Sequence, residues 1–128
     1  MKFKLTLLSV LISTFSFCQD LEGRWVNSSF TGAENMAYEF EEGNVMKMYY
    51  AGKEIPTAQP IVYSLKELDE DRHLIEMKYT NLANNLSADL IGVIVVLGKD
   101  KVEMEFWERS AVPEDYAFTE ESLIYYRE

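Results

Sequence analysis

The sequence predicts an all-β fold, an antiparallel up-and-down barrel of about eight strands. Three observations lead to this fold class. Apolar side chains recur at every second position through most of the chain, which is the period of a half-buried strand. Residues that favour turns interrupt these runs at intervals of roughly 8–14 residues, as hairpin connections require. The apolar residues show no period that indicates a helix longer than a turn or two.

The first three strands are expected at 23–28, 36–41 and 45–51. In the second and third of these runs, methionine and aromatic residues alternate with polar or small residues. Gly43-Asn44 lies between the two runs and is a turn signal. The two strands are therefore expected to form a hairpin.

The middle of the chain predicts a second hairpin. Two prolines confine the 54–60 stretch to a loop or a sheet edge, because proline cannot donate a ladder hydrogen bond. Strands are then expected at 61–65 and 74–79, where apolar and polar residues again alternate. The polar run 68–71 separates them and is expected to form the turn.

The last part of the chain contains the most apolar segment. The run 90–97 fits a strand better than a helix, because it is short and rich in β-branched side chains. The segment 81–89 before it is rich in turn-forming residues, and its sequence does not assign it to an element. The elements expected afterwards are a turn at 98–100, a strand at 102–107, a loop at 110–118 and a closing strand at 123–127.

The composition suits one folded domain with an acidic surface. The chain has 128 residues, enough for a single core. Its 12 basic and 22 acidic residues give a net charge of −10 at pH 7. Nucleic acids and anionic membranes attract basic surfaces, so this balance argues against both as partners. Hydrophobic residues make up 48% and charged residues 27%, which indicates a folded chain rather than a disordered one.

The first 18 residues have the pattern of a secretory signal peptide. Two lysines near the start precede the uncharged, largely apolar stretch 5–17. Ser16 and Cys18 are small and stand at the −3 and −1 positions of a cleavage site that follows Cys18. The stretch is shorter than the roughly 20 apolar residues of a membrane-spanning helix. We therefore expect a signal peptide at 1–18, a barrel domain at 19–128, and a secreted or periplasmic protein without a membrane span after cleavage.

Two alternatives for this segment stay open. Cys18 could be acylated as in bacterial lipoproteins, but Phe17 is large where that processing prefers a small residue. The segment could also remain as an uncleaved anchor. Cleavage would leave 110 of the 128 residues and remove two lysines but no acidic residue, so the net charge would become −12. The remaining chain would contain no cysteine, which excludes disulfides and thiol chemistry.

The sequence Gly23-Arg24-Trp25 resembles the Gly-x-Trp signature on the first strand of the lipocalin and wider calycin superfamily. In that superfamily the tryptophan closes one end of the barrel, and an arginine from the last strand lies across it. Arg127 is similar in position, and a guanidinium stacked on an indole contributes about 0.5–2 kcal/mol. The resemblance, to a short bacterial lipocalin-like domain, implies barrel closure by Gly23, Trp25 and Arg127 and a pocket for a small hydrophobic molecule.

Methionine and aromatic side chains fall on the apolar phase of nearly every expected strand. Methionine adapts to irregular shapes, and tyrosine brings a polar tip to an apolar wall. Such a lining suits a pocket for a hydrophobic ligand, and the same residues would also make a filled core. The candidate ligand-binding residues are Tyr38, Phe40, Met48, Tyr50, Tyr63, Met77, Tyr79, Met104, Phe106 and Tyr125.

Two other functions remain as alternatives. An interaction module in the cell envelope would have a filled core and an acidic outer face that docks a basic protein partner. A hydrolase would use Glu103 or Glu105 with His73, although an outward, solvated acidic stripe also accounts for the two glutamates. For Glu108 two interpretations stay open. Its side chain points inward and closes a pocket, or the strand ends before this residue. The residues otherwise predict no enzyme, no cofactor and no metal site.

Overall fold

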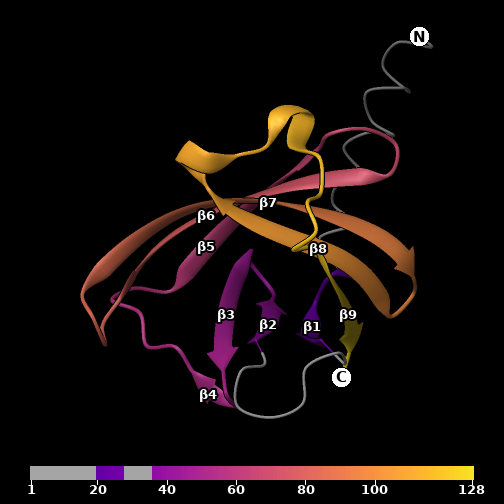
Figure 1. The fold of residues 1–128 in the computed structure, drawn as a ribbon. Coiled ribbons are helices and arrows are strands. Elements are labelled where there is room, and N and C mark those ends of the chain that lie inside the picture. The colour runs from indigo at the N-terminus through magenta and orange to yellow at the C-terminus, as the bar shows by residue number, and fades with distance from the viewer. Residues whose placement is uncertain (1–19, 28–35) are drawn as a thin grey trace, which may run out of the picture.

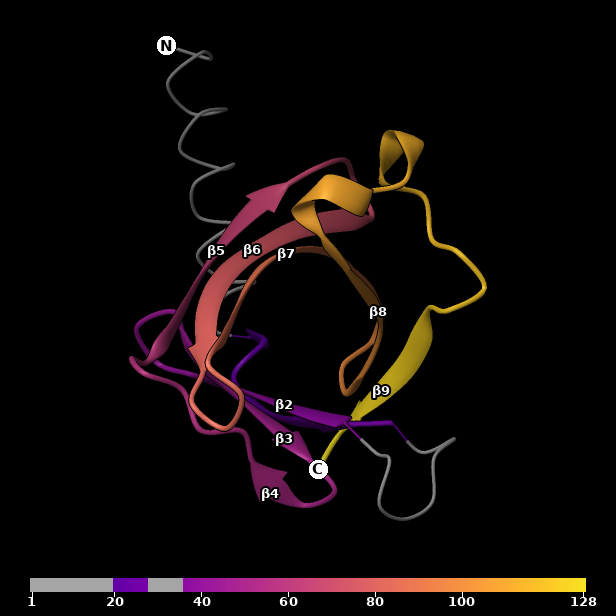
Figure 2. The same ribbon diagram turned by 60° about the vertical axis from the view of Figure 1, so that its left-hand side comes forward.

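Nine strands, counted over the residues that the structure describes, form one antiparallel sheet that closes on itself (Figure 1 and Figure 2). The computed structural model describes residues 20–27 and 36–128. The signal peptide predicted at 1–18 therefore lies outside the described residues. The strands are β1 (Gly23–Val26), β2 (Met36–Glu41), β3 (Val45–Tyr50), β4 (Lys53–Glu54), β5 (Ile61–Glu67), β6 (Arg72–Asn81), β7 (Leu86–Gly98), β8 (Lys101–Glu108) and β9 (Leu123–Arg127).

The ring consists of eight of these strands, each paired with its neighbours in the chain. The order is β1-β2-β3-β5-β6-β7-β8-β9, and β9 pairs back onto β1 to close it. β4 lies beside β3 as a two-residue addition within the region expected to be a loop or an edge. Figure 2 shows the ring with its interior facing the viewer. The prediction of an antiparallel up-and-down barrel is confirmed.

The hairpin of β6 and β7 is longer than the alternation predicts. Its register runs from Arg72 opposite Val95 to Asn81 opposite Leu86, so the turn is confined to 82–85. Most of the segment 81–89, which the sequence leaves unassigned, therefore belongs to the two strands. Ser87 and the residues around it have weak strand propensity, and pairing with β6 decides their conformation. One cross-strand contact there joins the hydroxyls of Ser87 and Thr80 at 3.0 Å.

Inward side chains from the whole ring form the main core. Trp25, Phe40, Ile75 and Met104 come from four different strands, and each is at most 1% exposed. Full burial of such a side chain contributes about 1.5–3 kcal/mol. Aromatic rings also meet across the interior, because the centroids of Phe40 on β2 and Tyr63 on β5 are 5.3 Å apart. The alternation in the sequence thus predicts the inward face of the barrel correctly.

A second, smaller core lies on the outer face of the barrel wall. Leu74 on β6 and Ile91 and Val93 on β7 point away from the interior, yet each is at most 5% exposed. The connection between β8 and β9, residues 109–122, runs outside the ring and covers them (Figure 2). We call this connection the strap. The partly buried side chains around the outer core are Leu68, Val95, Trp107, Val112, Tyr116 and Phe118.

The strap contains two short 3-10 turns, η1 (Arg109–Ala111) and η2 (Glu114–Tyr116), within the loop that the sequence predicts. In Figure 1 the strap is the segment that runs above β7 and β8. No helix in the described part of the chain is long and apolar enough to cross a membrane.

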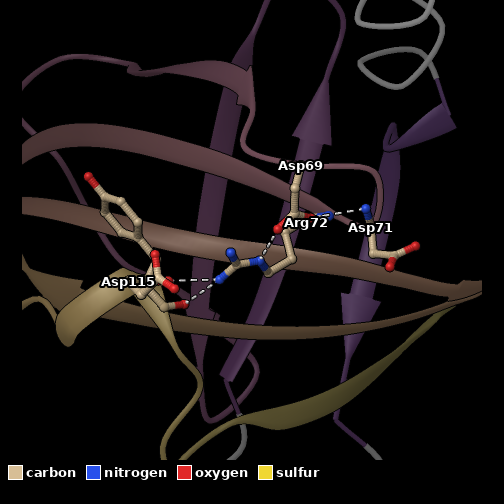
Figure 3. Close-up of polar contacts among 5 residues, drawn as sticks. Asp69, Asp71, Arg72 and Asp115 are labelled. Atoms are coloured by element: carbon tan, nitrogen blue, oxygen red, sulfur yellow. Dashed lines mark hydrogen bonds and ion pairs between the residues drawn. The ribbon is translucent and has the colours of Figure 1, made fainter.

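Arg72 ties the strap to the turn between β5 and β6 (Figure 3). Its Nε donates to Asp69 Oδ2 at 2.7 Å. Its Nη1 donates to the carbonyl oxygens of Asp115 at 2.9 Å and Tyr116 at 3.3 Å. Asp115 and Tyr116 have φ angles of 59° and 54°, a left-handed conformation that costs about 1 kcal/mol for a non-glycine residue. Arg72 thus holds a strained turn in place.

We expect Arg72→Ala to loosen the strap and leave the barrel folded. The carbonyls of the η2 turn would lose their donor, so amide hydrogen exchange over 114–117 should become severalfold faster, while β6 and β7 keep their protection. The Arg72 hydrogen bond lowers the pKa of Asp69 below its ordinary 3.8. The contact is therefore fully present at neutral pH and is lost as the pH falls through that lowered pKa. Unchanged exchange at the η2 turn would contradict this role of Arg72.

Candidate functional site

Trp25 is buried at one end of the barrel, which we call the closed end after the role that the resemblance assigns to it. Its indole is 1% exposed and donates from Nε1 to the carbonyl oxygen of Leu21 at 2.8 Å. The guanidinium carbon of Arg127 lies 4.5 Å from the centroid of the Trp25 ring. Gly23 has a φ of 124°, and a Cβ added there would lie 3.2 Å from Arg127 Nη1. The structure thus brings together the three residues that the resemblance assigns to barrel closure, with Leu21 as an addition that the sequence does not indicate.

Arg127 also joins β9 to the residues before β1 and to the turn between β7 and β8. Its Nε donates to Asp100 Oδ1 at 2.8 Å, and its two terminal nitrogens donate to the carbonyl oxygens of Asp20 and Glu22. A cleft of about 700 Å³ lies beside this contact. None of the ten candidate ligand-binding residues, all of which the structure describes, lines this cleft.

The ten candidate ligand-binding residues divide into a buried group and a partly exposed group. Tyr79 and Phe106 are partly buried and pack against the main core. Tyr50 is 50% exposed at the end of β3 and does not belong to that core. The other seven are buried together in the barrel interior: Tyr38, Phe40, Met48, Tyr63, Met77, Met104 and Tyr125.

The end of the barrel opposite Trp25 holds most of the partly buried side chains that pack against the main core, and we call it the mouth. It is the end where the hairpin turn at 82–85 and the beginnings of β2 and β9 lie. Five inward apolar side chains pack against the core there and stay partly exposed, whereas Leu21 and Trp25 at the closed end are each 1% exposed. The five are Met36, Tyr79, Leu90, Phe106 and Leu123.

Tyrosine hydroxyls bring polar atoms into the mouth half of the interior. The Tyr38 ring lies 5.1 Å from the Phe106 ring and 5.5 Å from the Tyr125 ring, centroid to centroid. Burial raises the pKa of Tyr38 above its ordinary 10.0, and the neighbouring Tyr125 raises it further through charge and a hydrogen bond. Burial and then the Glu108 carboxylate raise the pKa of Tyr79. At neutral pH these hydroxyls therefore stay protonated and can donate to a polar atom of a ligand.

Glu105 is a buried anchor for the strap. Its side chain is on the outer face of β8 and is 7% exposed, so its interpretation as part of a solvated acidic stripe is wrong. The Thr119 amide donates to Oε1 at 2.8 Å, and the Thr119 hydroxyl donates to Oε2 at 2.5 Å. The Trp107 indole donates to Oε2 at 2.8 Å. These bonds use both carboxylate oxygens to fasten the strap.

The structure does not bring the candidate hydrolytic residues together. His73 lies opposite Ile94 in the register of β6 and β7, and Ile94 belongs to the main core inside the ring. Glu103 and Glu105 lie on the outward register of β8, and Glu103 accepts a hydrogen bond from the Ser122 hydroxyl at 2.7 Å. The barrel wall therefore separates the histidine from both carboxylates.

Comparisons with protein-family models, with curated proteins and with solved structures found no match to this chain. Among the described residues, no group of three or more His, Cys, Asp or Glu side chains could hold a metal ion. The geometry defines the class of the molecule: a closed antiparallel up-and-down β-barrel with eight strands in its ring, consistent with a lipocalin-like fold. At one end of this barrel Trp25 is buried under the Arg127 guanidinium, and the other end is lined by partly exposed apolar and aromatic side chains.

Proposed function

We propose that this chain is a secreted or periplasmic lipocalin-like protein of the calycin superfamily that binds a small hydrophobic molecule inside the barrel. The observation that supports this most directly is the difference between the two ends. Trp25 and Leu21 seal one end, while Tyr79, Leu90 and Phe106 expose part of their inward surfaces at the other. A ligand entering at the mouth would bury this apolar surface, which favours binding by about 25 cal/mol per Å².

The lining of the mouth half suits an adaptable pocket. Met36 at the mouth and Met48 and Met77 deeper inside have flexible thioether side chains that can repack around different shapes. Tyr38 and Tyr125 add hydroxyl donors at the bottom of this region, which would fix the orientation of a ligand with one polar atom. A small, mostly apolar molecule with one polar end therefore fits best.

We expect Phe106→Ala to weaken binding of a fluorescent fatty-acyl or isoprenoid probe about tenfold, because one aromatic contact contributes roughly 0.5–1.5 kcal/mol beyond the area it buries. Tyr50→Ala at the end of β3 should weaken it less, since that side chain is 50% exposed. Tyr126→Ala is the matched control, because Tyr126 points outward at the closed end and is 38% exposed. Thermal unfolding of each variant separates lost binding from lost folding.

The binding proposal fails if the natural sequence binds none of a panel of fatty acids, sterols and isoprenoids. It also fails if Phe106→Ala and Tyr126→Ala have the same small effect on a probe that does bind.

A second candidate is an envelope interaction module. The ring contacts of Phe40 with Tyr63 and of Tyr38 with Phe106 favour it, because they fill the interior with side chains from strands that are not neighbours. The acidic outer face would then dock a basic protein. Such a complex should weaken as salt rises and should be unaffected by Phe106→Ala, in a protein that binds no small hydrophobic molecule.

A further inference from the structure

Glu108 places a carboxylate at the mouth of the barrel. In the register, Glu108 lies opposite Leu90, and Leu90 lies opposite Met77, so the three share the inward face of β8, β7 and β6. Tyr79 lies opposite Ala88 on the same face, one step closer to the hairpin turn. Tyr79 and Glu108 line the same pocket, and burial and then the Glu108 charge raise the pKa of the Tyr79 hydroxyl. Glu108 is exposed, so its carboxylate is accessible from the mouth.

Glu108 forms no ion pair within the ranges 20–27 and 36–128, although Lys78 lines the same pocket and pairs there with Asp89. Lys78 and Arg109, the basic residues nearest to it along these strands, are engaged on the outer face. Lys78 Nζ lies 3.9 Å from Asp89, and Arg109 lies 3.2 Å from Asp89 and 3.4 Å from Glu76. The inward register positions of β6, β7 and β8 in the mouth half hold no lysine, arginine or histidine.

Electron-rich aromatic rings lie next to this carboxylate. Phe106 is two residues before Glu108 on the same face of β8, a separation of about 6–7 Å along a strand. The Tyr38 ring stands 5.1 Å from the Phe106 ring. A pocket of about 650 Å³ at this end is lined by Tyr79, Ala88 and Glu108, by the outward residues Lys78, Thr80, Ser87 and Asp89, and by residues 58–60. Aromatic faces attract cations through their quadrupole, and a nearby carboxylate strengthens that attraction.

We propose that the ligand of this barrel carries a positively charged nitrogen on an apolar body, as in a long-chain amine or a quaternary ammonium amphiphile. The nitrogen would lie at the mouth between Glu108, Tyr79 and Phe106, and the apolar chain would point into the barrel. This inference rests on the proposed function, because it assumes that the mouth admits a hydrophobic molecule. It excludes a carboxylate headgroup, since Glu108 repels an anion there and the net charge of −10 disfavours its approach.

The test compares three probes that share one twelve-carbon chain: dodecylamine, dodecanol and dodecanoate, each below its micelle-forming concentration and measured by calorimetry at pH 7. We expect the amine to bind roughly tenfold more tightly than the alcohol, and the carboxylate to bind most weakly. Glu108→Gln should remove the preference for the amine and leave the affinity for dodecanol unchanged. Glu70→Gln is the matched control, because it removes the same charge from an exposed residue in the turn between β5 and β6 at the closed end.

The outcomes separate this inference from the proposed function. Equal binding of all three probes, or an amine preference that survives Glu108→Gln, overturns the cationic ligand and leaves the hydrophobic binder standing. An equal loss of amine affinity in Glu108→Gln and Glu70→Gln also overturns it, because the effect would then come from net charge alone. Failure of all three probes to bind counts against both proposals.

Discussion

Trp25→Ala is expected to destabilise the barrel by about 3–5 kcal/mol, the cost of truncating a large buried aromatic side chain. The indole is 1% exposed, and it contacts the Arg127 guanidinium on one side and the Leu21 carbonyl on the other. The substitution therefore removes a packed ring, a cation–π contact and a hydrogen bond together. Urea unfolding followed by circular dichroism measures the loss. A small domain is stable by only about 5–15 kcal/mol, so much of the margin disappears.

Trp25→Phe keeps this test informative if the alanine variant does not fold. Phenylalanine retains an aromatic ring under Arg127 and loses the indole N–H, so its cost should be much smaller, about 1 kcal/mol or slightly more. Arg127→Lys keeps the positive charge and loses the planar stacking group. If the alanine variant were as stable as the phenylalanine variant, the Trp25 side chain would not stabilise this end of the barrel.

Glu105→Ala is expected to cost about 2–3 kcal/mol and to release the strap from the outer wall. Hydrogen bonds to a charged group contribute about 1.5–3 kcal/mol, and this carboxylate accepts from the Thr119 amide, the Thr119 hydroxyl and the Trp107 indole. Without it, two donors of the strap and one of β8 lose their partner. Hydrogen exchange across 109–122 should accelerate, and Trp107 fluorescence should shift to the red as its ring meets water.

Glu103→Ala is the control for that experiment, because Glu103 lies two residues earlier on the same outer face of β8. Its side chain is less buried than that of Glu105, and the Ser122 hydroxyl is its hydrogen-bond donor within the described residues. We expect a loss below about 1 kcal/mol and an intact outer core. Equal effects of the two substitutions would show that the strap does not depend on the buried carboxylate.

The alternation of apolar and polar residues along the chain was sufficient to predict the eight-stranded ring. The strands β2, β3 and β5 carry polar side chains on most positions of an outward face that is at least partly exposed, so their apolar residues recur with a period of two. The turn at Gly43-Asn44 could be recognised because both residues adopt positive φ, which these residue types tolerate. The first and last strands carried a separate signal, since Gly23, Trp25 and Arg127 resemble a known closure motif.

The strap and the outer core could not be predicted from alternation. The run 90–97 is apolar at consecutive positions because Ile91 and Val93 are covered on the outside while Ile94 is buried on the inside. An uninterrupted apolar strand indicates that both faces are covered, and this was the signal available in the sequence. The strap covers the outer face because of tertiary contacts made by Arg72 and Glu105. Such contacts produce no periodic pattern in the sequence.

The candidate site was predicted in part. The alternation places Tyr38, Phe106 and Tyr125 on one inward face, and the structure brings these three rings together. It could not separate residues packed deep in the core, such as Phe40, from residues that reach the mouth, such as Tyr79. That distinction depends on the stagger of neighbouring strands around the ring. Glu108 was ambiguous for the same reason, and the structure includes it as the last residue of β8.

The contact of Arg127 with the start of β1 also constrains how the barrel folds. It joins residues up to 107 positions apart, whereas the hairpins form between near neighbours in the chain. Hairpins assemble in about 1–10 μs, but closing a long loop costs entropy that grows with its length. The hairpins can therefore form early, and the seam between β1 and β9 closes the ring last. This seam has two register pairs, reinforced by the Arg127 bonds, by the Asn27 side-chain bond to the Ile124 carbonyl and by the Glu128 amide bond to the Arg24 carbonyl. Because it joins the two most distant parts of the described chain, we expect its formation to limit the folding rate of the barrel.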